Sequence, residues 1–421
     1  MPGKTINKMW VGFFIVLSVF FFSACKDGRI FGGYRNDGAN DIRQTLDGGY
    51  IVAGYTRSFG AGGTDFWVLK LDGNGKEVWQ KTYGTESYET ADSVQQTMDG
   101  GYIIVGRTQS PTYGAKYWDF MILKIDAQGT EEWMKIFGGD GFEKALSVQQ
   151  TQDGGYVIGG VTTSVQGTAT PFGEGEKENT DCLILKIDAN GEYQWHQVYD
   201  GGNGDAVQAV LQTGDGGYIA AGYSKPLNGS YDFLVLKLRD DSYSGEIEWS
   251  RTYGGSQTEM AKSIKKTSDG GYIVAGDRAS DTGNDTDFWV VRIDSGGELI
   301  WSESYGGSGF ERANSIDLTS NGGYIVAGYT TSYGAGRNDF WIVKIDAAGT
   351  AEWAKTCGSP DYDVANSIHT TLDGGYIIAG NTAVSESNGL DFWIVKLTAD
   401  GKLPAEWQSP FTQILNLFPQ Q

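Results

Sequence analysis

Apolar and polar residues follow one pattern along the chain, and that pattern recurs about every 52 residues. In the sixth unit it predicts four strands, over residues 313–319, 324–329, 339–346 and 351–357. The second and third segments are apolar at successive positions, as expected for strands buried on both faces. Asn321-Gly322-Gly323 separates the first two strands. An Asn-Gly pair supplies the positive φ that a tight hairpin turn needs.

Two landmarks recur in seven repeats. A Gly-Gly-Tyr string, Asp-Gly-Gly-Tyr in six of them, ends at Tyr50, Tyr102, Tyr156, Tyr218, Tyr272, Tyr324 and Tyr376. A tryptophan follows near the end of each unit, at Trp79, Trp133, Trp195, Trp249, Trp301, Trp353 and Trp407. Four antiparallel strands per unit predict an all-β fold, a seven-bladed β-propeller of four-stranded antiparallel blades. A parallel β-helix would lack the hairpin turns. The repeats begin near Ile30, so we expect residues 26–421 to form one propeller domain.

The turn before the tryptophan carries a more specific motif, Asp-x-x-Gly-x-x-x-Trp, in five repeats. Its residues are Asp72, Gly75 and Trp79; Asp126, Gly129 and Trp133; Asp188, Gly191 and Trp195; Asp294, Gly297 and Trp301; Asp346, Gly349 and Trp353. It resembles the tryptophan-docking motif of PQQ-type quinoprotein propellers and of a related outer-membrane assembly lipoprotein. The resemblance implies that each tryptophan packs one blade against the next. Those propellers usually have eight blades, and the adjacent cysteine pair used in PQQ chemistry is absent here.

The complete repeat is similar to that of secreted bacterial and archaeal propeller proteins with "DGGYIVAGYT…DFWVLKLD" units. Some members of that group carry an endoglucanase label. The resemblance extends over all seven repeats. It implies a secreted propeller and leaves its chemistry open.

The N-terminus has the features of a secretory signal. Lys4 and Lys8 precede an apolar run over residues 9–22, which is too short to span a membrane comfortably. The run ends in Phe-Ser-Ala-Cys, which resembles the lipobox of bacterial lipoproteins, although Phe22 replaces the usual Leu. We therefore predict a signal peptide over residues 1–25 and lipidation of Cys25. An ordinary secretory signal is the alternative. No acidic residue directly follows Cys25, which favours the outer membrane or the cell surface.

The formal net charge of −21 narrows the classes of partner. An acidic chain has little with which to neutralise phosphates, so we expect no nucleic acid. It is also repelled by anionic lipid headgroups, so we expect contact with the membrane through the lipid anchor only.

The spacing between landmarks places the variable segments between the second and third strands. The longest is residues 161–180, in the third repeat. Loops that vary on a fixed scaffold often carry binding sites, so we predict a binding loop there. A solvated excursion is the alternative. The candidate residues are Gln166, Thr168, Pro171, Phe172, Glu174 and Glu176.

A carboxylate precedes the first strand of every repeat: Asp37, Glu89, Glu143, Asp205, Glu259, Glu311 and Asp363. Closed into a ring, these groups could surround the channel mouth and hold Ca²⁺, since hard cations favour oxygen ligands. The alternative is that each carboxylate accepts backbone N–H bonds within its own link. Their presence in every repeat at one spacing favours this alternative. No other metal or cofactor is predicted.

A second acidic series opens the third strand: Asp65, Asp119, Asp181, Asp232, Asp287, Asp339 and Asp391. A cation follows five residues later: Lys70, Lys124, Lys186, Lys237, Arg292, Lys344 and Lys396. We expect these groups to form a buried or half-buried charge network that is repeated for packing.

Catalysis has little support in the sequence. The two histidines, His196 and His369, lie in different repeats, and no nucleophile–histidine–acid set or zinc spacing can be assembled. We therefore predict a non-enzymatic binding scaffold for a protein or a glycan. A carbohydrate-active enzyme remains open because a glycosidase needs only two suitably spaced carboxylates. A subunit of an envelope assembly machine is a third interpretation, by analogy with the resembled lipoprotein.

Overall fold

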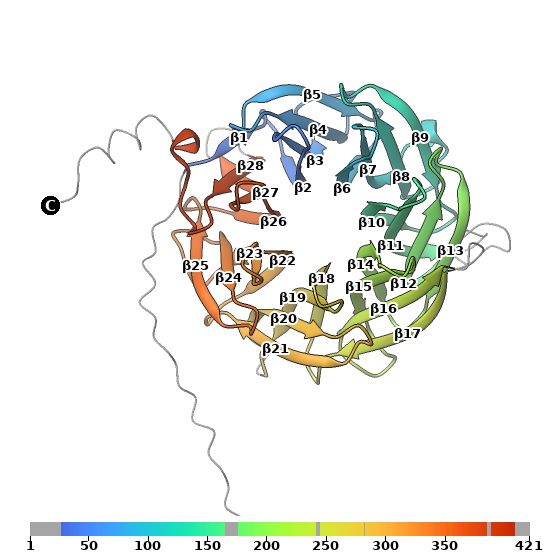
Figure 1. The fold of residues 1–421 in the computed structure, drawn as a ribbon. Helices are drawn as coiled ribbons and strands as arrows, with labels where there is room; N and C mark the ends of the chain where they lie inside the picture. The colour runs from blue at the N-terminus through green and yellow to red at the C-terminus, as the bar shows by residue number, and fades with distance from the viewer. Residues whose placement is uncertain (1–26, 165–175, 241–244, 282, 385–388, 409–421) are drawn as a thin grey trace, which may run out of the picture.

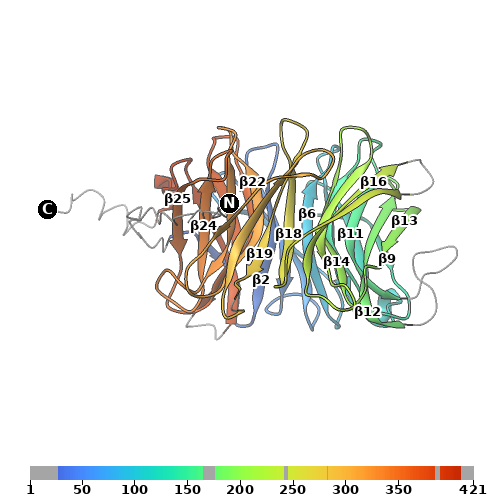
Figure 2. The ribbon, with the colours of Figure 1, turned by 90° about the horizontal axis from the view of Figure 1, so that it is seen from below.

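The chain folds into a closed ring of seven four-stranded sheets, as the computed structural model shows (Figure 1). The structure describes residues 27–164, 176–240, 245–281, 283–384 and 389–408. All strand pairs within the sheets are antiparallel, and the sheets stand around a central axis like blades (Figure 2). The predicted seven-bladed β-propeller is confirmed.

Each blade contributes one strand to each of four concentric layers. The innermost strands are β2 (Asp37–Gln44), β6 (Glu89–Gln96), β10 (Glu143–Gln150), β14 (Asp205–Gln212), β18 (Glu259–Lys266), β22 (Glu311–Leu318) and β26 (Asp363–Thr370). The second strands are β3 (Tyr50–Thr56), β7 (Tyr102–Thr108), β11 (Tyr156–Ser164), β15 (Tyr218–Ser224), β19 (Tyr272–Ala279), β23 (Tyr324–Thr330) and β27 (Tyr376–Val384). The third strands are β4 (Asp65–Leu71), β8 (Asp119–Ile125), β12 (Glu176–Ile187), β16 (Asp232–Asp240), β20 (Thr286–Ile293), β24 (Asp339–Ile345) and β28 (Gly389–Leu397). The outermost are β5 (Glu77–Tyr83), β9 (Glu131–Phe137), β13 (Tyr193–Tyr199), β17 (Gly245–Tyr253), β21 (Leu299–Tyr305), β25 (Ala351–Cys357) and β1 (Arg29–Phe31).

The two middle strands carry the core. In the first blade every residue of β4 is buried, whereas every residue of β5 is exposed or half-buried. This matches the apolar runs in the sequence, because a middle strand has a neighbouring blade on each face. Two 3₁₀ turns, η1 (Pro111–Tyr113) and η2 (Ala405–Trp407), complete the described elements. Within the described residues, no helix has the length and apolar character needed to cross a membrane.

Ring closure departs from the simple repeat. The segment near Ile30 does not open the first blade; β1 pairs with β28 and becomes the outer strand of the seventh blade. The first blade instead begins at Asp37. The two ends of the chain are thereby joined in one sheet, so the N-terminal strand fills the place where the seventh repeat diverges before Trp407.

The seven tryptophans each pack against the neighbouring blade. In the first blade the Trp79 ring packs over Gly129 of the second, and its Nε1–H donates to the Ala127 carbonyl at 3.3 Å. The corresponding pairs are Trp133–Gly191, Trp195–Gly245, Trp249–Gly297, Trp301–Gly349, Trp353–Gly401 and Trp407–Gly75. Trp407 lies in η2 rather than in a strand, yet it still reaches the first blade and completes the series.

The cation of the third strand is buried, but its partner differs from the one expected. Lys70 Nζ lies 2.9 Å from Asp47 Oδ2, and Asp47 belongs to the Asp-Gly-Gly turn. Asp65 lies five residues away along the strand, roughly 16 Å at ~3.3 Å per residue. The same pairing occurs in Lys124–Asp99, Lys186–Asp153, Lys237–Asp215, Arg292–Asp269 and Lys396–Asp373. The expected network is therefore two separate sets at opposite ends of the strand.

The sixth blade differs in the partner of its buried cation. Its turn has Asn321 in place of Asp, and Lys344 there pairs with Glu352 of the neighbouring outer strand, with Nζ and Oε2 2.7 Å apart. The outer-strand glutamate is a second partner in other blades too, as in Lys124–Glu132 and Lys237–Glu248. The sixth blade therefore keeps that partner and lacks the acidic residue of the turn.

The antiparallel order places two kinds of connection on one face of the ring. The segments between second and third strands and the links between blades all lie on this face, which we call the loop face. The Asp-Gly-Gly turns and the docking turns lie on the opposite face. The variable segments of the sequence are therefore gathered on one side of the ring, on a rigid scaffold.

Candidate functional site

The seven link carboxylates are the first residues of the innermost strands, and all are fully buried. In each link a backbone N–H four residues earlier donates to the carboxylate, as Thr85 does to Glu89 Oε2 at 2.8 Å. The other six bonds are Gly33–Asp37, Gly139–Glu143, Gly201–Asp205, Gly255–Glu259, Gly307–Glu311 and Ser359–Asp363. These side chains close their own links, the alternative that the sequence favours, and do not line an open channel mouth.

Each link carboxylate faces a second carboxyl group, the Asp that opens the third strand of the preceding blade. Burial raises the pKa of Asp119 to about 7, and the charge of Glu143 contributes. Burial likewise raises the pKa of Asp287 to about 6, with Glu311 beside it. The pairs of the other junctions are Asp65–Glu89, Asp181–Asp205, Asp232–Glu259, Asp339–Asp363 and Asp391–Asp37. Burial and mutual repulsion favour the protonated form of one group in such a pair, and because the pairs recur at every junction they are repeated structural features.

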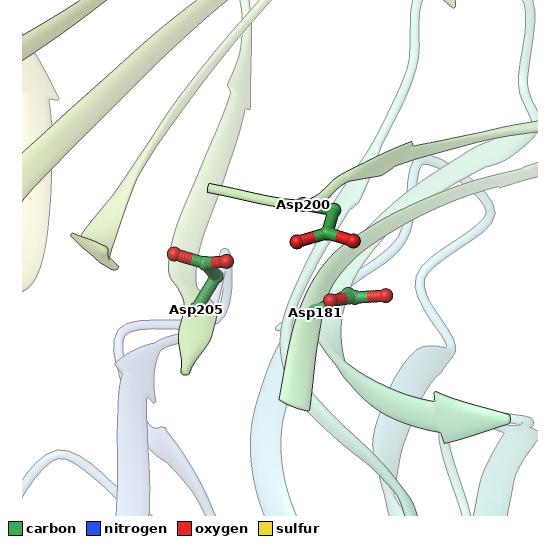
Figure 3. A group of neighbouring side chains, drawn as sticks. All are labelled: Asp181, Asp200 and Asp205. Atoms are coloured by element: carbon green, nitrogen blue, oxygen red, sulfur yellow. The ribbon is translucent and has the colours of Figure 1, made fainter. Parts of the chain in front are cut away.

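A glycine lies against the pair in six of the seven links. These residues, five positions before the link carboxylate, are Gly32, Gly84, Gly138, Gly254, Gly306 and Gly358. A β-carbon at any of them would overlap the side chain of the third-strand Asp. The link between the third and fourth blades has Asp200 at this position. It adds a third carboxyl group to Asp181 and Asp205, and one ligand oxygen from each lies within 4.8 Å of the others (Figure 3).

Two adjoining hollows occupy another part of the loop face. The first has a volume of about 840 Å³, and its lining includes Tyr34, Arg35, Arg57 and Phe59. Tyr34 is 92% exposed and Phe59 41%, which is unusual for rings of this size. Both belong to the first blade's own connections, one to the link from β1 and the other to the segment before β4.

The second hollow, of about 590 Å³, lies between the first and second blades and shares Arg57 with the first. The ring centroids of Tyr88 and Trp118 are 6.5 Å apart, and the Arg107 guanidinium lies 4.6 Å from the Trp118 centroid. Tyr55 also lines the hollow. It therefore presents aromatic surface beside two guanidinium groups. No residue that lines either hollow in the described part of the chain carries a carboxyl group.

A separate charged network lies among the innermost strands. His369 of β26 has Nδ1 3.3 Å from Asp317 Oδ2 and Nε2 3.8 Å from Asp41 Oδ1. Arg43 Nε lies 3.5 Å from Asp41, and Lys265 Nζ 3.6 Å from Asp317. Burial acts to raise the pKa of both carboxyl groups, but Arg43, Lys265 and His369 hold it well below its usual range. The network joins four innermost strands, β2, β18, β22 and β26, and fixes His369 in a structural setting.

The other histidine is also fixed locally. His196 Nδ1 lies 2.7 Å from the Tyr193 hydroxyl of the same strand, and burial lowers its pKa. The structure thus brings neither His196 nor His369 to the hollows.

The candidate loop of the third blade is shorter than the sequence indicates. Strands β11 and β12 extend into residues 161–180, and Ser164 pairs with Glu176. Gln166, Thr168, Pro171, Phe172 and Glu174 lie outside the described residues, as does Cys25.

Sequence reasoning identified the variable segments that share one face of the ring, but not the hollows. Trp118 precedes a third-strand Asp, where other repeats have threonine, tyrosine, asparagine or leucine. Arg107 directly follows the second-strand glycine, and Arg57 lies three residues after it. A comparison of the repeats position by position shows these residues as departures from the common pattern. The same comparison identifies Asp200. The distances between them follow only from the ring.

Comparison with known proteins supports the fold but indicates neither a family nor a function. No protein-family model matches the chain. The regulatory protein FlaEY of Caulobacter vibrioides is 26% identical over 190 residues, or 39% of this chain, and the match spans only 19% of that protein's length.

Solved structures with a similar fold have unrelated roles. A puromycin hydrolase has a TM-score of 0.52 at 12% identity, over 92% of this chain and 57% of its own. The Pan2 WD40 domain of Neurospora crassa has a TM-score of 0.50 at 12% identity, over 88% of this chain and 97% of its own. At such identities the likeness is one of fold alone.

Proposed function

We propose that this protein is a non-enzymatic binding protein of the cell envelope, anchored through a lipid on Cys25, and that its loop face binds an acidic glycan. The observation that carries the proposal is the second hollow, where Tyr55, Tyr88 and Trp118 lie beside Arg57 and Arg107.

The dimensions and lining of this hollow suit a sugar. About 590 Å³ lies within the ~300–1,000 Å³ range of small-ligand sites. Aromatic faces pack against the apolar faces of sugar rings. Asn36, Thr90 and Gln109 add polar groups that can hydrogen-bond hydroxyls.

The charge pattern favours an anionic ligand. Arg57 has one side-chain bond, from Nε to the Thr64 hydroxyl at 3.2 Å, and Arg107 packs on Trp118. Neither guanidinium has a carboxylate within ion-pair distance among the described residues. In a chain of net charge −21, two such groups in one hollow form a local site for carboxylates or sulfates.

The same hollow argues against hydrolysis. Glycosidases use two carboxyl groups that flank the scissile bond, and the described lining of both hollows has none. In the acidic pairs of the ring, the seven link carboxylates are fully buried between blades.

Isothermal titration calorimetry with oligogalacturonates, and with neutral gluco-oligosaccharides of equal length, tests the proposal. We expect binding of the acidic oligomers that weakens as salt is added, because guanidinium–carboxylate attraction is screened. Trp118→Ala and Arg107→Gln should each weaken binding about tenfold or more, a loss of about 1.4 kcal/mol.

Tyr231→Ala is the matched control, because Tyr231 has the repeat position of Trp118 but lies in the fourth blade, outside both hollows. It should bind as the unmodified protein does. Equal binding by Trp118→Ala would exclude the hollow as the site. Shortening of the oligomers would instead support a carbohydrate-active enzyme, and capture of a protein in place of any glycan would support an assembly role.

A further inference from the structure

The link that opens the first blade differs from the other six. Tyr34 and Arg35 lie three and two positions before its carboxylate, Asp37. At these two positions the other links carry acidic, small or polar residues and one proline. They are Glu86 and Ser87, Asp140 and Gly141, Gly202 and Asn203, Ser256 and Gln257, Ser308 and Gly309, and Pro360 and Asp361. An aromatic ring followed by a cation is therefore confined to one junction, where it breaks the sevenfold pattern.

Both side chains are exposed, and both line the first hollow. Tyr34 has 92% of its surface exposed, so the fold gains almost nothing from burial of its ring. The Arg35 guanidinium forms no ion pair with any residue that the structure describes. In a chain of net charge −21, a guanidinium without an internal counter-charge is available to a carboxylate or sulfate of a ligand.

The connection between β3 and β4, which also lines the first hollow, is held firmly in place. The Phe59 ring packs on the buried Trp67 ring at a centroid distance of 5.3 Å. The Arg35 N–H donates to the Ser58 hydroxyl at 3.0 Å, and that hydroxyl donates to Asp37 Oδ2 at 2.7 Å. Ser58 thus joins the connection to the link and to a fully buried carboxylate. A lining that is already ordered loses little conformational entropy when a ligand binds.

Arg57 makes the two hollows continuous, because it lines both of them. Hollows of about 840 and 590 Å³ together exceed the ~300–1,000 Å³ range of sites for one small ligand. Their described lining combines aromatic rings with guanidinium groups and has no carboxyl group. This surface therefore suits a long ligand that carries sugar faces and anionic groups along its length.

We propose that the loop face binds an extended strand of an acidic polysaccharide, which occupies both hollows at once, and that Tyr34, Arg35 and Phe59 form a second subsite. This inference rests on the proposed acidic-glycan function and adds to it the length of the ligand and the residues that recognise the additional sugars.

Each residue of the second subsite has a stated part in recognition. The Tyr34 and Phe59 rings pack against sugar faces, and the Arg35 guanidinium pairs with a carboxylate or sulfate. Arg57 lies where the two hollows meet. Once one part of the strand is bound in the second hollow, contact with the first hollow becomes intramolecular. The affinity should therefore rise with the length of the ligand until both hollows are filled.

Isothermal titration calorimetry of the purified chain with galacturonate oligomers of two to eight units tests this inference. We expect the octamer to bind about tenfold or more tightly than the dimer. Tyr34→Ala and Arg35→Gln should each remove most of this gain. Arg35→Gln should also lessen the salt dependence of octamer binding, because one guanidinium–carboxylate contact is lost. Both side chains are exposed, so the melting temperatures of the variants should match that of the unmodified chain.

Tyr362→Ala and Arg337→Gln are the matched controls. These residues form an exposed tyrosine–arginine pair elsewhere on the loop face, with the guanidinium 5.6 Å from the ring centroid, and they line neither hollow. Both variants should keep the full gain in affinity with length.

Two results would overturn the second subsite and leave the glycan function standing. One is a dimer that binds as tightly as the octamer. The other is an unchanged gain with length in both Tyr34→Ala and Arg35→Gln. In either case, binding of the dimer that is weakened by Trp118→Ala would still support the second hollow. Failure of every oligomer to bind would overturn both proposals.

Discussion

Removal of the Trp407 ring is the most informative perturbation of this fold, because that ring closes the series of docked tryptophans. Trp407 is 1% exposed and packs over Gly75, where no β-carbon would fit beside it. Its ring meets Tyr50 edge-on at a centroid distance of 6.2 Å, and the Arg29 guanidinium lies 5.0 Å from its centroid. The contact thus joins the C-terminal segment to the first blade and to the closing strand β1.

The magnitude follows from this burial. Replacement of a buried tryptophan by alanine costs ~3–5 kcal/mol, through lost transfer energy and the cavity left behind. Trp407→Ala should therefore lower the free energy of unfolding by about 4 kcal/mol. Trp301→Ala, which removes a half-buried ring from an intact outer strand, should cost about 3 kcal/mol. Trp407→Phe should lose less than Trp407→Ala, because a ring remains over Gly75.

Urea titrations followed by fluorescence and by circular dichroism measure these differences. A single free energy is meaningful only where the two probes coincide, since repeat proteins can unfold in parts. A loss of less than about 1 kcal/mol for Trp407→Ala would refute the reasoning. It would show that the pairing of β1 with β28 closes the ring without help from η2.

Three further predictions rest on other parts of the chain. Asp119→Asn should raise the melting temperature at pH 8 and flatten the decline of the melting temperature between pH 4 and 7. The reason is that the raised pKa of Asp119 gives the fold stability that is lost as the pH rises. An unchanged pH profile would contradict the pairing of Asp119 with Glu143. Asn321→Asp should stabilise the fold by about 0.5 kcal/mol in urea titrations, since it gives Lys344 a second counter-charge beside Glu352; destabilisation would argue against pairing with the turn. Cys25→Ser should move the protein from the membrane to the soluble fraction on cell fractionation, and retention would exclude lipid anchoring.

Contacts that repeat at fixed spacing could be predicted from the sequence. In the sixth blade, the predicted outer strand over 351–357 coincides with β25, and the other three strands differ from prediction by one or two residues at their ends. The turn at Asn321 and the buried middle strands likewise follow from local patterns, whereas the docking role of Trp301 is implied only by the resemblance to other propellers. Hairpin turns and alternation act over a few residues, so the chain encodes them directly.

The tertiary structure decided which distant residues meet. Lys70 has the charge expected, but the antiparallel register sets it beside Asp47 and far from Asp65. The ring brings β1 to β28 across more than 350 residues, because the seventh blade takes its outermost strand from the N-terminal segment. Asp200 appears in the sequence as one more surface acid. Only the packing of the third blade on the fourth places it against two buried carboxyl groups.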